Sequence, residues 1–295
     1  MNGLIIIDKS EGLSSQAVVT RVKRLLGVKK AGHTGTLDPM ATGVLPVLLD
    51  RGVKASEFML TADKHYRATL LLGITTDTED VTGTVLTHAD SLPSEDEVLC
   101  TVSSFVGKYL QTPPMYSALK IGGKKLCDLA REGVTVEREP REVEIFSIDC
   151  KRLSDAEYSL DVHCSKGTYI RTLCADIGAR LSVGGVMKAL RRTSASGFSL
   201  DDSYTLEQLE AMSDEQRLST VLPVERIFEE YREIKLPEFF SHLAHSGLEI
   251  YLSKIGKIAT LGEIVRLSDS NGFFAVGEVR EYENGPAIKP IKQFG

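Results

Sequence analysis

The stretch Gly32–Gly43 reads GHTGTLDPMATG and is the most informative part of the chain. Its three glycines allow left-handed backbone conformations, or the close approach of a ligand to the main chain. Apolar residues recur here with neither the period of a strand nor that of a helix, so we predict a loop. Asp38 is the only carboxylate of the loop, and Pro39 restricts its backbone to extended or turn conformations. Because an isolated Asp-Pro pair is usually a turn, a functional role for Asp38 depends on its surroundings.

Regular elements are predicted on both sides of this loop. Leu4–Ile7 is a short apolar run typical of a strand, and a helix capped by Ser14 or Ser15 follows it. Beyond the loop, Lys64–Gly73 is rich in apolar residues and ends in glycine, which predicts another strand. Tyr66 lies near the start of this strand, where a tyrosine is usually a packing residue.

The second half of the chain shows two amphipathic patterns. Tyr158–Cys164 alternates apolar and polar residues, which predicts a half-buried strand with His163 on its solvated face. A helix is predicted from about Ile170, because apolar residues recur there at helical spacing. Arg171 lies in its first turn, where a positive charge opposes the helix dipole. We therefore expect Arg171 to serve a partner carboxylate rather than the stability of the helix.

Two further segments differ from their surroundings. Residues 108–140 contain a Pro-Pro pair, a Gly-Gly pair and a short basic helix near Lys124–Arg131. We interpret this segment as a flexible insertion that closes on a ligand, with an ordinary surface excursion as the alternative. From about Ile234 onward, short strands alternate with glycine turns, which predicts a small β-barrel-like domain.

The composition is typical of a soluble globular protein. A length of 295 residues allows one large domain and one small domain, and 42% of the residues are hydrophobic and 26% charged. Apolar runs such as Leu4–Ile7 are far too short to span a membrane, and Asp8 ends that run before a signal peptide could form. The five cysteines include no C-x-x-C pair, which argues against a zinc site or a disulfide framework and for a reducing cytoplasm.

Positive charge is concentrated locally, although the net charge is −6. Residues 201–233 carry ten acidic and three basic side chains, so the rest of the chain is nearly neutral. Local charge decides phosphate binding, although any single basic cluster is usually a solvated face. The clusters are Arg21, Lys23, Arg24, Lys29 and Lys30; Lys120, Lys124, Lys125 and Arg131; and Lys188, Arg191 and Arg192.

Four motifs together resemble the TruB family, the bacterial tRNA pseudouridine-55 synthases. They are DKSEGLSS at 8–15, GHTGTLDPMATGVLP at 32–46, KHYRATLLLG at 64–73 and CSKGTYIRTLCADIG at 164–178, and they occur in the order of the family. The similarity extends through QTPPMYSALK at 111–120 and into the C-terminal strands, which resemble a PUA RNA-binding domain. Two places depart from the family pattern, namely the turn at Asp50–Lys54 and Cys127 in the insertion.

The resemblance implies an α+β fold in which a mixed, largely antiparallel sheet is flanked by helices. Residues 1–233 would form the catalytic domain, with an RNA-clamping insertion at about 108–140, and residues 234–295 a PUA-like domain. The implied reaction is isomerisation of the T-loop uridine of tRNA to pseudouridine without a cofactor or metal. We expect a cytoplasmic monomer that binds the tRNA T-arm but neither DNA nor membrane, and the sequence leaves open whether it also assists tRNA folding.

The resemblance also assigns site residues by motif position. Asp38 would be the catalytic aspartate, and Arg171 would pair with it. The remaining substrate-binding residues would be Tyr66, stacked on the target base; His33, at the displaced T-loop nucleotides; and Tyr169 and Leu190, in the wall of the pocket.

This chemistry is also reasonable from the residues themselves. An ionised Asp38 can act as a nucleophile at the sugar or the base, or can remove a sugar proton, and the sequence leaves these routes open. An arginine ion pair would keep it ionised, an aromatic face would hold a uracil that must rotate, and the nucleotide must flip out of its loop. The alternatives are an RNA chaperone without chemistry and a glycoside-type hydrolase using Asp38 with Asp8. A phosphate-binding NTPase is disfavoured because the chain has no G-x-x-x-x-G-K-[ST] motif.

Overall fold

The computed structural model describes residues 2–117 and 119–295, without the side chains of residues 120, 121, 125 and 127. The departure at Cys127 therefore lies outside the described side chains. Within the described residues, no helix has the length and apolar character needed to cross a membrane.

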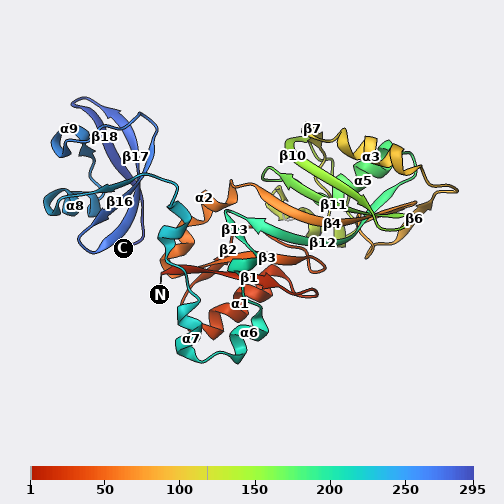
Figure 1. Ribbon diagram of the computed structural model, residues 1–295, viewed down its shortest axis with the longest axis horizontal. Helices are drawn as coiled ribbons and strands as arrows, with labels where there is room; N and C mark the ends of the chain where they lie inside the picture. The colour runs from red at the N-terminus through yellow and green to blue at the C-terminus, as the bar shows by residue number, and fades with distance from the viewer. Residues whose placement is uncertain (1, 118) are drawn as a thin grey trace.

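A nine-stranded mixed sheet forms the body of the fold (Figure 1). Its main path runs β1-β3-β12-β4-β11-β10-β7, and within this sheet the described pairs are antiparallel except for the parallel pair β12–β3. The prediction of a largely antiparallel sheet flanked by helices is confirmed. The strands are β1 (Gly3–Lys9), β2 (Ala31–His33), β3 (Thr42–Leu49), β4 (Lys64–Leu72), β7 (Gly107–Gln111), β10 (Arg141–Arg152), β11 (Glu157–Cys164), β12 (Gly185–Ala195) and β13 (Phe198–Ser199).

The three longest described helices of the body share one hydrophobic core with the sheet. They are α1 (Ser15–Leu25), α3 (Glu95–Ser103) and α5 (Ile170–Arg180). Alternate residues of β4 and β11 enter this core because successive side chains of a strand point to opposite faces. The predicted start of α1 is confirmed, since Ser14 caps it, and Ser94 forms a capping box with Glu97 at the start of α3.

Shorter elements complete the body of the fold. They are α2 (Ser56–Leu60), α6 (Leu206–Ala211), α7 (Asp214–Ser219), the 3-10 turns at Asp50–Ala55, Leu200–Asp202 and Val224–Phe228, and the hairpin of β5 (Ile74–Thr76) with β6 (Val85–His88).

The turn at Asp50–Lys54 has a definite geometry. Asp50 adopts a left-handed φ of 46°, and its Oδ1 accepts hydrogen bonds from the Lys29 and Lys30 N–H groups, each at 3.0 Å. Gly52 packs so closely that an added Cβ would lie 2.4 Å from the Gly3 carbonyl oxygen. The departure from the family pattern is therefore accommodated by a 3-10 turn.

The first residues of the segment at 108–140 belong to β7, the edge strand of the nine-stranded sheet. The excursion from the sheet starts after Gln111 and contains β8 (Lys120–Ile121), β9 (Lys124–Lys125) and α4 (Leu126–Arg131). The predicted basic helix near Lys124 starts later than expected, because residues 124–125 pair with β8 instead.

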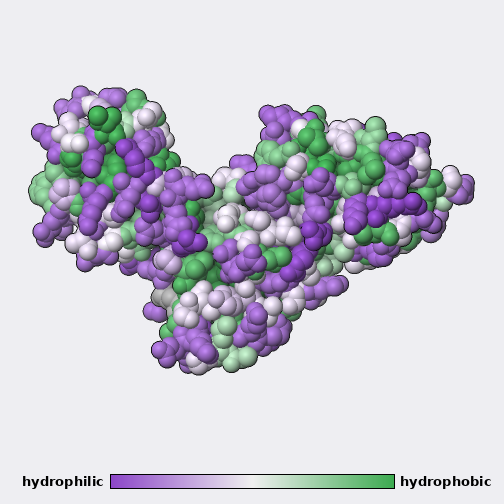
Figure 2. Space-filling view, viewed as in Figure 1, coloured by the Kyte–Doolittle hydropathy of each residue, from purple (hydrophilic) through white to green (hydrophobic). Residues whose placement is uncertain are grey.

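The C-terminal part forms its own five-stranded sheet, of order β14-β16-β17-β18-β15. It contains an apolar cluster of its own, yet its Phe273 and Phe294 also pack on Phe228 of the body, with ring centroids 5.8 and 5.5 Å away. The outline of the molecule is concave between this sheet and the body (Figure 2). The elements are β14 (Glu233–Lys235), α8 (Glu238–His245), β15 (Ile250–Tyr251), α9 (Leu252–Ile255), β16 (Ile264–Asp269), β17 (Gly272–Tyr282) and β18 (Gly285–Gln293).

Candidate active site

Asp38 lies in the loop between β2 and β3, and this loop is anchored by Lys9 at the end of β1. The Lys9 side chain is fully buried, and its Nζ donates to the carbonyls of Ser10, Pro39 and Ala41 at 3.0, 3.1 and 2.6 Å. Burial lowers the pKa of Lys9 to about 8, while the negative charge of Asp38 acts in the opposite direction. One ammonium group thus fixes the backbone on the C-terminal side of Asp38.

Ser15 ties helix α1 to the other side of Asp38. Its Oγ donates to the Leu37 carbonyl at 3.0 Å and accepts from the Leu37 N–H at 2.8 Å. The Ala41 N–H donates to the Asp38 carbonyl at 3.0 Å and closes the turn. The DKSEGLSS motif therefore supplies the scaffold of the Asp38 turn.

Arg192 of β12 holds the two ends of the same loop. Its buried guanidinium donates from Nε to the Val44 carbonyl at 2.7 Å and from Nη2 to the Gly35 carbonyl at 3.2 Å. Gly43 has a φ of +103°, and a Cβ there would lie 2.1 Å from the Arg192 carbonyl oxygen. Glycine is required at position 43 because strands β3 and β12 approach each other at this point.

Arg171, in the first turn of α5, contacts Asp38 directly. The residue is 6% exposed, and its Nη2 lies 3.1 Å from Asp38 Oδ2. The same guanidinium donates to the Tyr116 carbonyl at 2.8 Å and the Thr78 carbonyl at 3.2 Å, and its Nη1 lies 3.3 Å from Asp80 Oδ2. Arg171 is thus shared between two carboxylates.

Asp80 is a part of this network that the sequence analysis missed. It is 4% exposed, and its Oδ1 accepts from the Thr82 N–H at 2.9 Å and the Thr78 Oγ1 at 2.8 Å. Because Oδ1 is held in this way, Oδ2 has a fixed position from which to orient Arg171. The only signal in the sequence was the polar turn at 75–83, which resembles a surface turn.

The pKa of Asp38 is not lowered, although an arginine partner was expected to keep this carboxylate ionised. Burial raises the pKa of Asp38 above the ordinary 3.8, and this effect outweighs the opposing charge of Arg171; Asp80 raises the pKa further. The Asp38 side chain nevertheless remains 35% exposed. The arrangement is a carboxylate that is open to a ligand, held in orientation and set near the centre of a charged network.

Comparisons with known proteins agree with this site. The N-terminal domain of the TruB family pseudouridylate synthases matches residues 23–170, and the C-terminal domain of tRNA pseudouridylate synthase B matches residues 171–229. The chain belongs to the TruB family.

Relatives of known name support this membership. The tRNA pseudouridine synthase B of Alkaliphilus oremlandii is 46% identical over 85% of this chain and 83% of its own length. That of Clostridium tetani is 40% identical over 94% of this chain and 96% of its own length. The crystal structure of a Cbf5-Nop10-Gar1 complex is similar with a TM-score of 0.74 at 24% identity, over 99% of this chain and 85% of that chain, and shows the shared fold.

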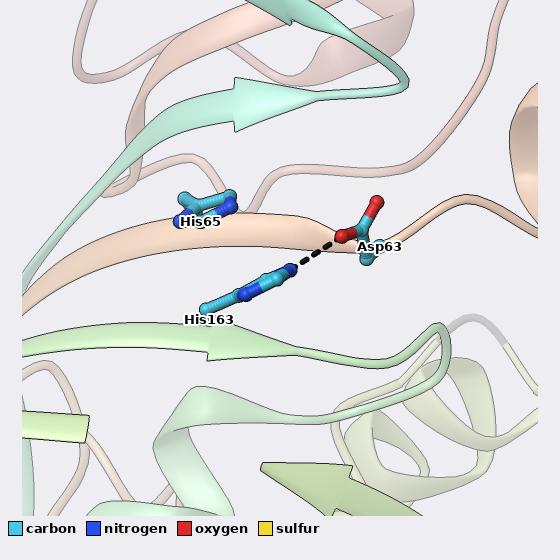
Figure 3. A group of neighbouring side chains, drawn as sticks. All are labelled: Asp63, His65 and His163. Atoms are coloured by element: carbon cyan, nitrogen blue, oxygen red, sulfur yellow. Dashed lines mark hydrogen bonds and ion pairs between the residues drawn. The ribbon is translucent and has the colours of Figure 1, made fainter. Parts of the chain in front are cut away.

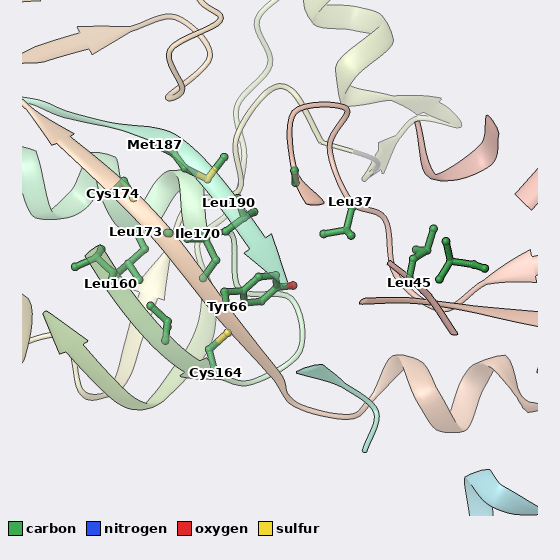
Figure 4. Close-up of a cluster of buried hydrophobic side chains, with 14 of the residues drawn as sticks. Leu37, Leu45, Tyr66, Leu160, Cys164, Ile170, Leu173, Cys174, Met187 and Leu190 are labelled. Carbon is green, nitrogen blue, oxygen red and sulfur yellow. The ribbon is translucent and has the colours of Figure 1, made fainter. Parts of the chain in front are cut away.

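Tyr66 lies at the edge of the core in this TruB family chain. It is 8% exposed and belongs to the same apolar cluster as Ile170 and Leu190 (Figure 4). Burial raises the pKa of its hydroxyl, and the charge of Asp38 contributes in the same direction, so the phenol stays protonated. Tyr66 is thus a core residue that also borders the charged network.

Two other predicted residues lie around the same network. The main chain of Tyr169, the N-cap residue of α5, is held by Gln111, which accepts from its N–H at 2.8 Å and donates to its carbonyl at 3.0 Å. Burial raises the pKa of the Tyr169 phenol; the charge of Arg171 lowers it and that of Asp38 raises it. Leu190 is a buried residue of β12.

His33 is the last residue of β2. It is partly exposed, and its Nδ1 accepts from the Gly35 N–H at 3.4 Å. Burial and the charge of Arg192 lower its pKa, which favours a neutral imidazole.

The group of side chains with metal-ligand spacing found among the described residues does not include Asp38. It consists of Asp63, which directly precedes β4, His65 on β4 and His163 on β11. The charged groups that act on Asp38 are mainly positive. Arg171 pairs with its carboxylate and Lys9 lies nearby, while Asp80 is the one acidic group that acts on its pKa among the described residues.

Proposed function

We propose that this chain converts the T-loop uridine at position 55 of tRNA into pseudouridine, with Asp38 as the catalytic residue. The observation that carries the proposal is the partly exposed Asp38 carboxylate, which Lys9 and Ser15 fix through its loop and Arg171 contacts directly. A rigid scaffold of this kind is what a reacting group needs to keep a productive orientation.

The reaction requires the C1′–N1 bond to break and a C1′–C5 bond to form, with loss of the proton from C5 and gain of one at N1. An ionised Asp38 can attack the sugar or the base, or can remove a sugar proton. Arg171 favours the ionised form and opposes the burial that raises the pKa of Asp38. Tyr66 would stack on the detached uracil, since an aromatic face holds a base without fixing one orientation.

Binding of the tRNA would rest on those basic clusters that are free to meet phosphates. Lys23, Arg24, Lys29 and Lys30 are exposed around the end of α1. The cluster at Lys188–Arg192 serves the fold instead, because Lys188 pairs with Glu157, Arg191 pairs with Asp8, and Arg192 is buried. We therefore assign the phosphate footprint to the α1 end, not to this cluster.

We also propose that residues 1–233 are the catalytic domain and residues 234–295 a PUA-like RNA-binding domain. The separate apolar cluster of the C-terminal sheet supports this division. The excursion that follows β7 would clamp the T-arm, with His33 at its displaced nucleotides and Tyr169 and Leu190 in the pocket wall. The enzyme would act as a cytoplasmic monomer, and its reaction would need no cofactor or metal.

Release of tritium from a T-arm transcript labelled at C5 of its uridines tests the reaction. Isomerisation predicts one tritium released per transcript, and none from a transcript with cytidine at position 55. An RNA chaperone predicts no release, and a glycoside-type hydrolase predicts free uracil and an abasic site. Either of these results would overturn the proposal.

A further inference from the structure

Three potential metal ligands meet on the face of the sheet opposite Tyr66. His65 on β4 and His163 on β11 are directly opposed in the antiparallel register. Their rings stack with centroids 3.9 Å apart and planes 13° apart. Asp63, just before β4, hydrogen bonds through Oδ2 to Nε2 of His163 (Figure 3). His163 is therefore not the freely solvated residue that the sequence suggested.

The three side chains have the spacing of a ligand set. One ligand atom from each residue lies within 4.8 Å of the others. A tetrahedral zinc ion bound at about 2.0–2.1 Å needs ligand atoms about 3.3–3.4 Å apart. Because a ring nitrogen binds a metal in the plane of its ring, the two stacked imidazoles must turn relative to each other to share one ion. Asp63 and His65 are exposed and His163 is partly exposed, which leaves room for this rearrangement. Within the described part of the chain, no hydrogen bond occupies the His65 ring.

We propose that Asp63, His65 and His163 bind a divalent transition-metal ion of the Zn²⁺ class. Two imidazoles and one carboxylate form a donor set that suits zinc and leaves a fourth position to water. The site contains no cysteine, so the cysteine pattern that argued against a zinc site does not bear on it.

A metal here would clip β4 to β11 beside the active site. His65 directly precedes Tyr66, and His163 precedes Cys164 and the loop that leads to Tyr169. Because successive strand residues point to opposite faces, the metal would lie behind the substrate-facing side and need not touch RNA. The proposal is independent of the reaction catalysed.

Two titrations of the full-length protein test the site, one with ZnCl2 by calorimetry and one with CoCl2 followed by visible absorption. We expect one equivalent of Zn²⁺ to bind and Co²⁺ to produce the ligand-field bands of a tetrahedral nitrogen–oxygen site. H65N and H163N should each weaken binding at least about tenfold. H65N leaves the Asp63–His163 hydrogen bond in place, and circular dichroism verifies that each variant is folded.

Matched controls exclude binding elsewhere. H88N removes an exposed histidine of β6, and C100S removes an exposed thiol, and both should bind Zn²⁺ as the wild type does. Failure of the wild type to bind at millimolar Zn²⁺ would overturn the proposal and leave the cluster as a hydrogen-bonded, stacked pair. Undiminished binding by a folded H65N/H163N double variant would overturn it equally.

Discussion

Replacement of Arg171 by lysine should separate its role at Asp38 from its role in the fold. The guanidinium meets two carboxylates and two carbonyls at 2.8–3.3 Å, whereas an ammonium is a single point that cannot bridge Asp38 and Asp80. A hydrogen bond to a charged group contributes about 1.5–3 kcal/mol, so the loss of one of the two carboxylate contacts costs about that much. If this loss falls on the transition state, turnover decreases about 10- to 10²-fold.

Single-turnover tritium release with excess enzyme measures this effect, and urea unfolding measures stability. We expect some loss of stability, because the Thr78 and Tyr116 carbonyls lose a donor. Arg67→Lys is the matched control, since Arg67 is an exposed residue of β4 that pairs with Asp161, and it should leave both measurements unchanged. Turnover of Arg171→Lys within about threefold of wild type, alongside reduced stability, would refute the role at Asp38.

The remaining predictions concern the neighbouring parts of the site and the RNA footprint. Tyr66→Ala should weaken capture of the flipped base by about 1–3 kcal/mol and Tyr66→Phe should not, as measured by binding of a T-arm hairpin; an unfolded alanine variant would mean that Tyr66 is only a core residue. Turnover should fall as the pH decreases through the pKa of Asp38, and because burial raises that pKa, the acid limb should lie above pH 3.8; a limb at or below 3.8 would contradict this. The salt dependence of tRNA binding should become shallower in a Lys29→Gln/Lys30→Gln variant, by a log–log slope of about 0.9 per lost duplex phosphate contact, and stay unchanged in Lys188→Gln, whose partner is Glu157. Removal of residues 234–295 should weaken tRNA binding and leave a folded but less stable body, because Phe228 loses Phe273 and Phe294; global unfolding by circular dichroism would argue against separate domains.

Local patterns in the sequence predicted the elements that carry the site. Helix α1, strands β4 and β11 and helix α5 all show a period or a cap that depends on neighbouring residues alone. The unfavourable position of Arg171 against the helix dipole correctly indicated a carboxylate partner. Only one nitrogen of Arg171 pairs with Asp38, because the other meets Asp80.

The residues that hold the loop could not be recognised from local patterns. Lys9, Asp80 and Arg192 are charged and are usually solvent-exposed types, yet all three are buried. Their partners are main-chain groups and side chains up to 157 positions away, so only the assembled sheet brings them together. The turn at 75–83 resembles a surface turn because Val81 is its only apolar residue.

The Asp38→Asn variant tests the central claim most directly. The substitution keeps the size of the side chain and the anchored turn, and it removes the carboxylate that contacts Arg171. Tritium release from a C5-labelled T-arm transcript and tRNA affinity are measured on the same preparation. The account predicts no release above background with affinity unchanged, whereas release at a rate close to that of the wild type would contradict the assignment of Asp38 as the catalytic residue.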